Sequence, residues 1–183
     1  MARKDQRKAA RARRADEPEA AVQGPRTTTF NILFVCTGNT CRSPLAEGIA
    51  RAEIRRRGWK NVEVGSAGLA ATDGSPASAE AVTVAGRAGI DLERHRSRPL
   101  TPRLVDWADL ILGMGASHVT ALDRMGAGER ATTLGDFAAG AEQEGRSVAD
   151  PYGQGEAVYE ETFQELRGLI GAALDRLAPI LAP

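Results

Sequence analysis

Residues 36–44 read Cys36-Thr37-Gly38-Asn39-Thr40-Cys41-Arg42-Ser43-Pro44. The stretch follows a strand-like run, 30–35, and precedes a helical pattern that starts at Leu45. At such a turn, backbone N–H groups can surround an anion, and the following helix points its positive end at the same place. Because the same donors favour a thiolate, Cys36 is predicted to be a nucleophile inside an anion-binding loop. Arg42 adds a planar guanidinium that matches two phosphate oxygens.

Short apolar runs alternate with helical patterns along the rest of the chain. The apolar runs predict strands at 32–35, 62–64, 109–112 and 131–134. The helical patterns predict helices from 45 to Gly58 and at 78–88, 102–107, 117–125 and 156–177. Ser43 is expected to cap the first helix, and a turn is expected at 66–68. The alternation predicts an α/β fold in three layers, a mostly parallel four-stranded sheet with helices on both faces, which binds ligands at the carboxyl ends of its strands.

Charge divides the 183 residues into an arm and one domain. Residues 1–29 hold eight Lys/Arg and four Asp/Glu, a net charge of +4, and are predicted to be a disordered, basic, Ala/Arg-rich arm. Residues 30–183 form the predicted domain. Because the whole chain is neutral, nucleic acid is not expected to bind the domain, whereas the arm leaves nucleic acid or an acidic protein open as a partner.

Cysteine and histidine are scarce. The chain has two cysteines, Cys36 and Cys41, and two histidines, His95 and His118. A disulfide framework or a zinc site would need more of them, so the site is predicted to use no metal and no cofactor, in a reducing cytoplasm. No apolar run reaches the ~18–20 residues that span a bilayer, so no membrane segment is predicted. The sequence predicts no oligomeric state.

A second motif, Asp150-Pro151-Tyr152-Gly153, lies just before the last predicted helix. By itself it is typical of an ordinary Asp-Pro turn. A thiolate that attacks a phosphorylated substrate needs a group that protonates the leaving oxygen or nitrogen. An aspartic acid in a loop could supply this proton and then act as the base for the water that hydrolyses the phosphocysteine. Together with the cysteine loop, Asp150 is therefore interpreted as catalytic.

The two motifs together resemble the low-molecular-weight protein tyrosine phosphatase family. Residues 36–44 match its signature and residues 150–152 match its general-acid motif, in the same order along the chain. The resemblance covers about 31–177, with further matches at 66–68, 95–97 and 109–112. It implies a protein phosphatase that acts on phosphorylated protein side chains through a phosphocysteine.

The resemblance also implies a role for each matching residue. Cys36 is the nucleophile, Arg42 holds the phosphate, Ser43 bonds the thiolate, and Asp150 is the acid and then the base. The phosphate-binding loop comprises Thr37, Gly38, Asn39, Thr40 and Cys41. Asn39 is expected to hold this loop through hydrogen bonds linked to Ser66 and His95. In this family the second cysteine can form a reversible disulfide with the first, so Cys41 is either such a redox partner or a small buried residue, and both roles are compatible.

The substrate pocket is expected to contain Thr40, Tyr152 and Leu69. Tyrosine-specific members usually carry a bulky aliphatic residue in place of Thr40, whereas Thr40 resembles the bacterial protein arginine phosphatase branch. A small hydroxyl residue leaves room for a guanidinium, which Asp150 could attract, and Gly153 lacks the second aromatic ring of tyrosine-specific relatives. Tyr152, however, could stack on a phosphotyrosine. The sequence thus favours phosphoarginine, with phosphotyrosine as the alternative.

Three other activities fit parts of the pattern. An arsenate reductase of the same fold shares the start of the loop, but its disulfide relay needs cysteines after Cys41, and the chain has none. A phosphoresidue-binding module without activity would be expected to have lost Cys36 or Asp150. A metal or redox module built on the two cysteines would need further ligands. The sequence therefore favours the phosphatase.

Overall fold

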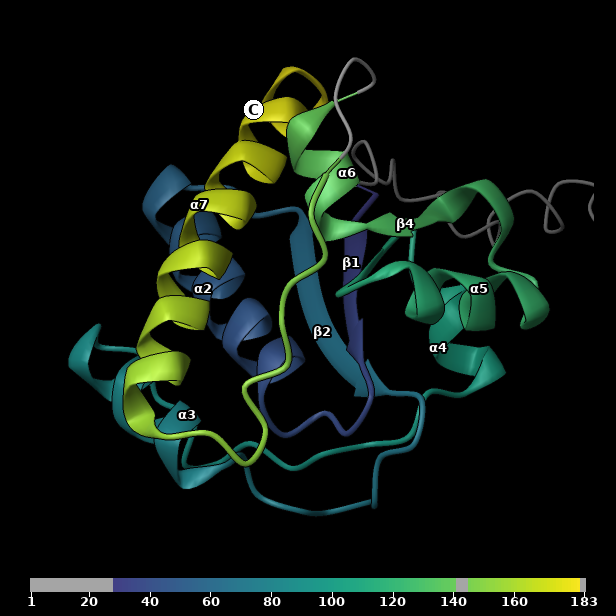
Figure 1. Cartoon of the computed structure of the whole chain (residues 1–183). Coiled ribbons are helices and arrows are strands. Elements are labelled where there is room, and N and C mark those ends of the chain that lie inside the picture. The colour runs from purple at the N-terminus through teal and green to yellow at the C-terminus, as the bar shows by residue number, and fades with distance from the viewer. Residues whose placement is uncertain (1–27, 141–144, 182–183) are drawn as a thin grey trace, which may run out of the picture.

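The fold is an all-parallel sheet between two layers of helices (Figure 1). The computed structural model describes residues 28–140 and 145–181, so the predicted arm lies almost entirely outside the described residues. Four strands form the sheet in the order β2-β1-β3-β4. Their bounds are β1 Phe30–Cys36, β2 Val62–Gly68, β3 Leu110–Gly113 and β4 Ala131–Thr133. The predicted parallel four-stranded sheet is confirmed.

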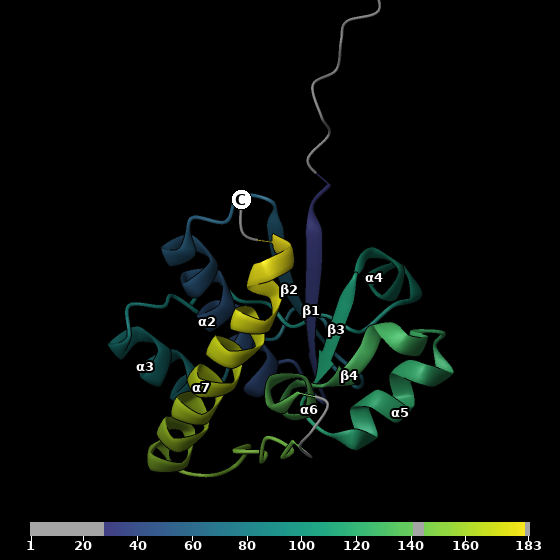
Figure 2. The same cartoon turned by 90° about the horizontal axis from the view of Figure 1, so that it is seen from above.

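Helices cover both faces of the sheet, as predicted (Figure 2). On one face lie α2 (Arg42–Arg57), α3 (Ala79–Arg87) and α7 (Glu156–Leu181). On the other face lie α4 (Pro102–Trp107) and α5 (Ala116–Arg124). The short helix α6 (Leu134–Ala139) follows β4 and packs against α7, and a 3-10 turn spans Gly128–Arg130. Among the described residues, none of these helices is both long and apolar enough to cross a bilayer.

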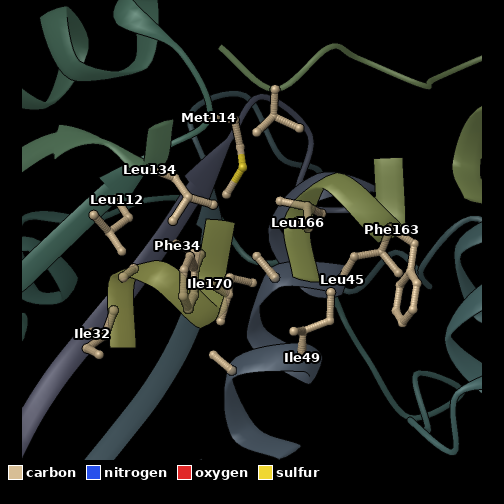
Figure 3. Packing of buried hydrophobic residues seen from close by; sticks show 14 of the residues in the cluster. Ile32, Phe34, Leu45, Ile49, Leu112, Met114, Leu134, Phe163, Leu166 and Ile170 are labelled. Carbon is tan, nitrogen blue, oxygen red and sulfur yellow. The ribbon is translucent and has the colours of Figure 1, made fainter. Parts of the chain in front are cut away.

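The central strand β1 explains the two-sided core. Because successive side chains of a strand point to opposite faces, Ile32 and Phe34 face α2 and α7, whereas Leu33 and Val35 face α4 and α5. Phe34 packs with residues of α2 and α7 such as Leu45 and Ile170 (Figure 3). Full burial of side chains of this size contributes about 1.5–3 kcal/mol each. The end of β1, where Cys36 lies, is therefore held rigidly from both sides.

Three local expectations need correction. Helix α2 begins at Arg42, and Ser43 is not its cap, because Cys41 occupies the N-cap position and the Ser43 hydroxyl turns inward. Residues 66–68 continue β2 rather than forming a turn, since each pairs with β1. Helix α6 was not predicted, because it begins directly after β4 with Thr133 as its cap, and Leu134 was assigned to the strand at 131–134. The predicted end of α2 at Gly58 is confirmed, with φ 72° in the left-handed region that favours glycine.

Candidate active site

Cys36 ends the central strand, and its sulfur lies inside the loop that follows. The Ser43 hydroxyl lies 3.0 Å from Cys36 Sγ, and the backbone N–H of Asn39 points to the same sulfur at 3.3 Å. The loop leads directly into the N-terminus of α2, so the positive end of this helix faces the thiol. The sulfur thus lies where both a thiolate and a phosphate would be stabilised.

Asn39 holds the loop in a strained shape. Its φ of 54° is a left-handed conformation that a non-glycine residue adopts at a cost of about 1–3 kcal/mol. Four hydrogen bonds offset this cost, three of them through the buried side-chain amide of Asn39 and one through its backbone carbonyl. Nδ2 donates to the hydroxyls of Ser43 (2.8 Å) and Ser66 (2.9 Å). Oδ1 accepts the Arg98 backbone N–H (2.9 Å), and His95 Nε2 donates to the Asn39 carbonyl (2.7 Å).

The contacts of Asn39 with Ser66 and His95 are those that the sequence predicted, and the Arg98 backbone was missed.

Gly68 makes room for the same loop. A Cβ atom at this position would lie 2.6 Å from the Thr37 carbonyl oxygen and 2.9 Å from the Asn39 nitrogen. Any side chain there would push the loop out of shape, so this glycine is required by close packing.

Arg42 and Asp150 meet above the thiol, although 108 positions separate them in the sequence. Arg42 donates one N–H to Asp150 Oδ2 at 2.6 Å and another to the Val148 carbonyl at 3.1 Å. Val148 also donates its backbone N–H to the Met114 carbonyl, which anchors the loop before Asp150 to the end of β3. The Arg42 side chain is buried, and its Nε has no partner in the described part of the chain, so this donor remains for a bound anion.

A cleft of about 480 Å³ opens over these groups. Its lining comprises Cys36, Thr37, Gly38, Thr40, Cys41, Arg42, Ala70, Thr72, Ser75, Asp150 and Tyr152. Thr40 therefore faces the cleft, and Tyr152, whose side chain is 74% exposed, lies at its rim. Across residues 28–140 and 145–181, no group of three or more His, Cys, Asp or Glu side chains could hold a metal ion.

Leu69 does not belong to this lining, contrary to the expectation from the sequence. It continues the alternation of β2, so its side chain lies on the same face as Ala67 and packs against the core beneath α4 and α5. The wall of the cleft is formed instead by the small residues Ala70, Thr72 and Ser75. This wall of the pocket is therefore more polar than it would be with the leucine that the sequence predicted there.

Comparison with known proteins shows to which protein family this site belongs. The sequence model of the low molecular weight phosphotyrosine protein phosphatase family matches residues 31–179. The chain belongs to this family. It is therefore a cysteine-dependent protein phosphatase and a hydrolase, as predicted.

Relatives of two named activities match the chain. A protein-arginine-phosphatase of Geobacillus stearothermophilus is 39% identical over 151 residues, which cover 81% of this chain and 94% of the relative. The low molecular weight protein-tyrosine-phosphatase Etp of Escherichia coli (strain K12) is 36% identical over 135 residues, 73% of this chain and 86% of the relative. Among solved structures, a serine variant of the arginine phosphatase YwlE with a phosphorylated active-site serine superposes with a TM-score of 0.77, 35% identity and coverage of 82% and 97%.

Cys41 is held from the far side of the phosphatase loop. Its sulfur lies 3.0 Å from the hydroxyl of Tyr159, a fully buried residue of α7. Burial, and then the bond to Cys41, raises the pKa of Tyr159, so its phenol stays protonated beside the sulfur. This contact was missed, because Tyr159 is 118 positions away and reads as one more core residue of α7. The disulfide partnership of Cys41 with Cys36 stays a prediction.

His118 supports the loop from α5. Its Nε2 lies 3.2 Å from the Thr37 hydroxyl, beside the nucleophile. Burial, and then the charge of Arg42, lowers the pKa of His118 below its ordinary value of 6.5. The imidazole is therefore neutral at physiological pH. The sequence named this histidine only when a zinc site was considered.

We expect acid to destabilise the protein partly through His118. The unfolded chain binds a proton on this side chain at a higher pH than the folded chain does, so the free energy of unfolding should fall as the pH drops below about 6.5. A His118→Gln variant lacks this proton uptake. Urea titrations should therefore show a smaller loss of stability in the variant than in the wild type between about pH 7 and pH 5. Equal losses in the two proteins would contradict the assignment.

Proposed function

We propose that this phosphatase hydrolyses phosphoarginine side chains of proteins. The observation that carries the proposal is that Thr40 lines the cleft together with Asp150 and the small residues Ala70, Thr72 and Ser75. A small side chain at this place leaves width for a guanidinium, and once Asp150 has given up its proton its carboxylate attracts the positive charge of the leaving group. The name of the Geobacillus relative, protein-arginine-phosphatase, supports the same choice.

The reaction proceeds through a phosphocysteine. The Cys36 thiolate attacks phosphorus, and the bond from phosphorus to the guanidinium nitrogen breaks as Asp150 gives this nitrogen a proton. Asp150 then takes a proton from water, which attacks the phosphocysteine and releases phosphate. Arg42 and the loop amides hold the phosphoryl oxygens through both steps. In the free protein Asp150 forms an ion pair with Arg42. An incoming phosphate therefore replaces the carboxylate at Arg42, and Asp150 becomes available to the leaving group.

Phosphotyrosine is the second candidate, and Tyr152 is the observation that favours it. Its ring lies exposed at the rim of the cleft, where it could stack on a phenol ring. The E. coli relative is named a protein-tyrosine-phosphatase. Gly153, the next residue, offers no second ring on the other side.

A comparison of phosphoarginine and phosphotyrosine peptides tests the proposal. We expect the wild type to have the higher kcat/KM for phosphoarginine, and Thr40→Ile to reduce this preference by about tenfold or more, because a branched aliphatic side chain narrows the cleft. Thr40→Ser, which stays small and keeps a hydroxyl, should retain the preference. A wild-type preference for phosphotyrosine that Tyr152→Ala removes would establish the second candidate instead.

The substrate is thus a phosphorylated protein. A cytoplasmic location is part of the proposal, because the nucleophile works only as a free thiol, and Cys36 and Cys41 are both free. Residues 30–183 act as the phosphatase domain in this proposal. The basic arm over 1–29, and nucleic acid as its partner, stay predictions from the sequence.

A further inference from the structure

Glu47 lies one helical turn after Ser43 on α2 and was not among the predicted site residues. Its Oε2 accepts the hydroxyl proton of Ser66 at 2.6 Å. Its Oε1 accepts an N–H of Arg51 at 2.5 Å, and Arg51 also donates to the Val64 carbonyl at the edge of the sheet. The carboxylate is partly buried, and both of its oxygens are engaged.

A carboxylate only accepts hydrogen bonds, and this fixes the direction of its bond with Ser66. The single hydroxyl proton of Ser66 goes to Glu47, so the Ser66 oxygen is free to accept from Asn39 Nδ2. The amide of Asn39 cannot turn round, because its oxygen accepts the Arg98 backbone N–H. The second Nδ2 proton of Asn39 therefore goes to the Ser43 oxygen.

Ser43 then has one proton left to give. Two acceptors lie within reach of this hydroxyl, Cys36 Sγ at 3.0 Å and the Ala67 carbonyl at 3.5 Å. The shorter contact directs the proton to the sulfur, where it stabilises negative charge. The distance between Ser43 and Cys36 alone leaves the donor undecided. The orientation of the Asn39 amide decides it, and this amide is held by the Arg98 backbone N–H and by Ser66, which Glu47 orients.

We propose that Glu47 is a positioning residue: by taking the Ser66 proton it keeps the Ser66 oxygen as an acceptor for Asn39 Nδ2, and so helps to hold the amide that leaves the Ser43 proton for the Cys36 sulfur. The thiolate gains this bond both as the attacking nucleophile and when it leaves the phosphocysteine. The inference rests on the proposed cysteine mechanism but not on the identity of the substrate.

Glu47→Gln is a sharp test because Arg51 selects which end of the new amide faces Ser66. Arg51 can only donate, so it takes the amide oxygen, and the NH2 group then points at Ser66 as a donor. Ser66 loses the acceptor that orients its proton, and the order of the relay is disturbed. The double variant Glu47→Gln/Arg51→Ala lets the amide turn its oxygen back to Ser66. Arg51→Ala alone leaves the carboxylate in place and is the matched control.

The readout is the rate at which iodoacetamide alkylates Cys36, followed across pH and located by fragment-ion mass spectrometry. In Glu47→Gln we expect alkylation near neutral pH to be about tenfold slower and the midpoint of the pH profile to move upward, with a matching fall in kcat. Arg51→Ala should stay within about twofold of the wild type, and the double variant should recover at least half of the loss on a logarithmic scale. The other charged and titratable groups around the loop are the same in all four proteins: Cys41, Arg42, His95, His118, Asp150 and Tyr159.

Circular dichroism and thermal unfolding verify that each variant is folded. Wild-type alkylation in folded Glu47→Gln, or a double variant no faster than the single one, would overturn the inference. A merely structural role would lower stability without moving the pH profile, and would not be rescued by removing Arg51. If instead the cysteine mechanism itself were wrong, a variant without Cys36 would still turn over substrate. That result is distinguishable from a failure of the Glu47 inference, which concerns the alkylation rates of variants that keep Cys36.

Discussion

Replacing Cys36 by serine should lower turnover of every phosphorylated substrate by about 10⁵-fold. The side chain ends a rigid central strand, with its sulfur 3.0 Å from Ser43 and 3.3 Å from a backbone N–H. A serine hydroxyl in the same place stays protonated at neutral pH, so the nucleophile is lost while the anion-binding loop remains. Steady-state assays with phosphopeptides and with an aryl phosphate measure the loss.

Two controls separate lost chemistry from lost structure. Thermal unfolding of Cys36→Ser should stay close to that of the wild type, because the two side chains differ by one atom. Cys41→Ser, at the other cysteine of the loop, should reduce turnover by no more than about tenfold, since a hydroxyl can keep a hydrogen bond with Tyr159. The phosphorylated serine of the YwlE variant suggests a further observation, a slowly formed phosphoserine at position 36 that intact-mass measurement would detect. Turnover of Cys36→Ser within tenfold of the wild type would exclude a phosphocysteine.

Asp150→Asn should slow hydrolysis of phosphopeptides by about 10²–10⁴-fold, because the leaving group loses its proton donor. With p-nitrophenyl phosphate, whose leaving group departs without protonation, the loss should be much smaller. The ratio of the two kcat/KM values is therefore the measurement. Asp106→Asn, an exposed aspartate of α4, provides the matched control and should leave both values unchanged.

The ion pair with Arg42 gives Asp150→Asn a second, opposite effect. In the free protein the Asp150 carboxylate occupies the guanidinium at 2.6 Å, so it competes with any anion that binds there. Removing its charge should tighten the binding of inorganic phosphate by several-fold, observed as stronger product inhibition. Weaker phosphate binding, or an equal loss of activity on both substrates, would show that Asp150 supports the loop rather than supplying a proton.

The sequence predicted the elements whose signal is local. The buried strand before Cys36 is a continuous apolar run, and the arginines before Gly58 mark the end of α2, so both were found. Helix α6 was missed because it follows β4 without a break, so that Leu134 was assigned to the strand. Ser43 was misread as a helix cap, since a serine before a proline at a helix start favours capping unless a partner from another element claims its hydroxyl. That partner is Cys36, seven positions away across the loop.

The sequence by itself was enough to predict the nucleophile, its arginine and the acid, because each belongs to a short motif whose residue types are required by the chemistry. Only the tertiary structure decided how these groups are supported. Asp150 reaches Arg42 through a loop that the Val148 backbone anchors, and backbone contacts leave no mark in the sequence. Leu69 does not line the pocket, because the alternation of β2 directs its side chain into the core. Glu47 joined the site because one helical turn of α2 brings it against Ser66 of the neighbouring strand. Such contacts depend on which elements pack together, and packing is a property of the whole chain.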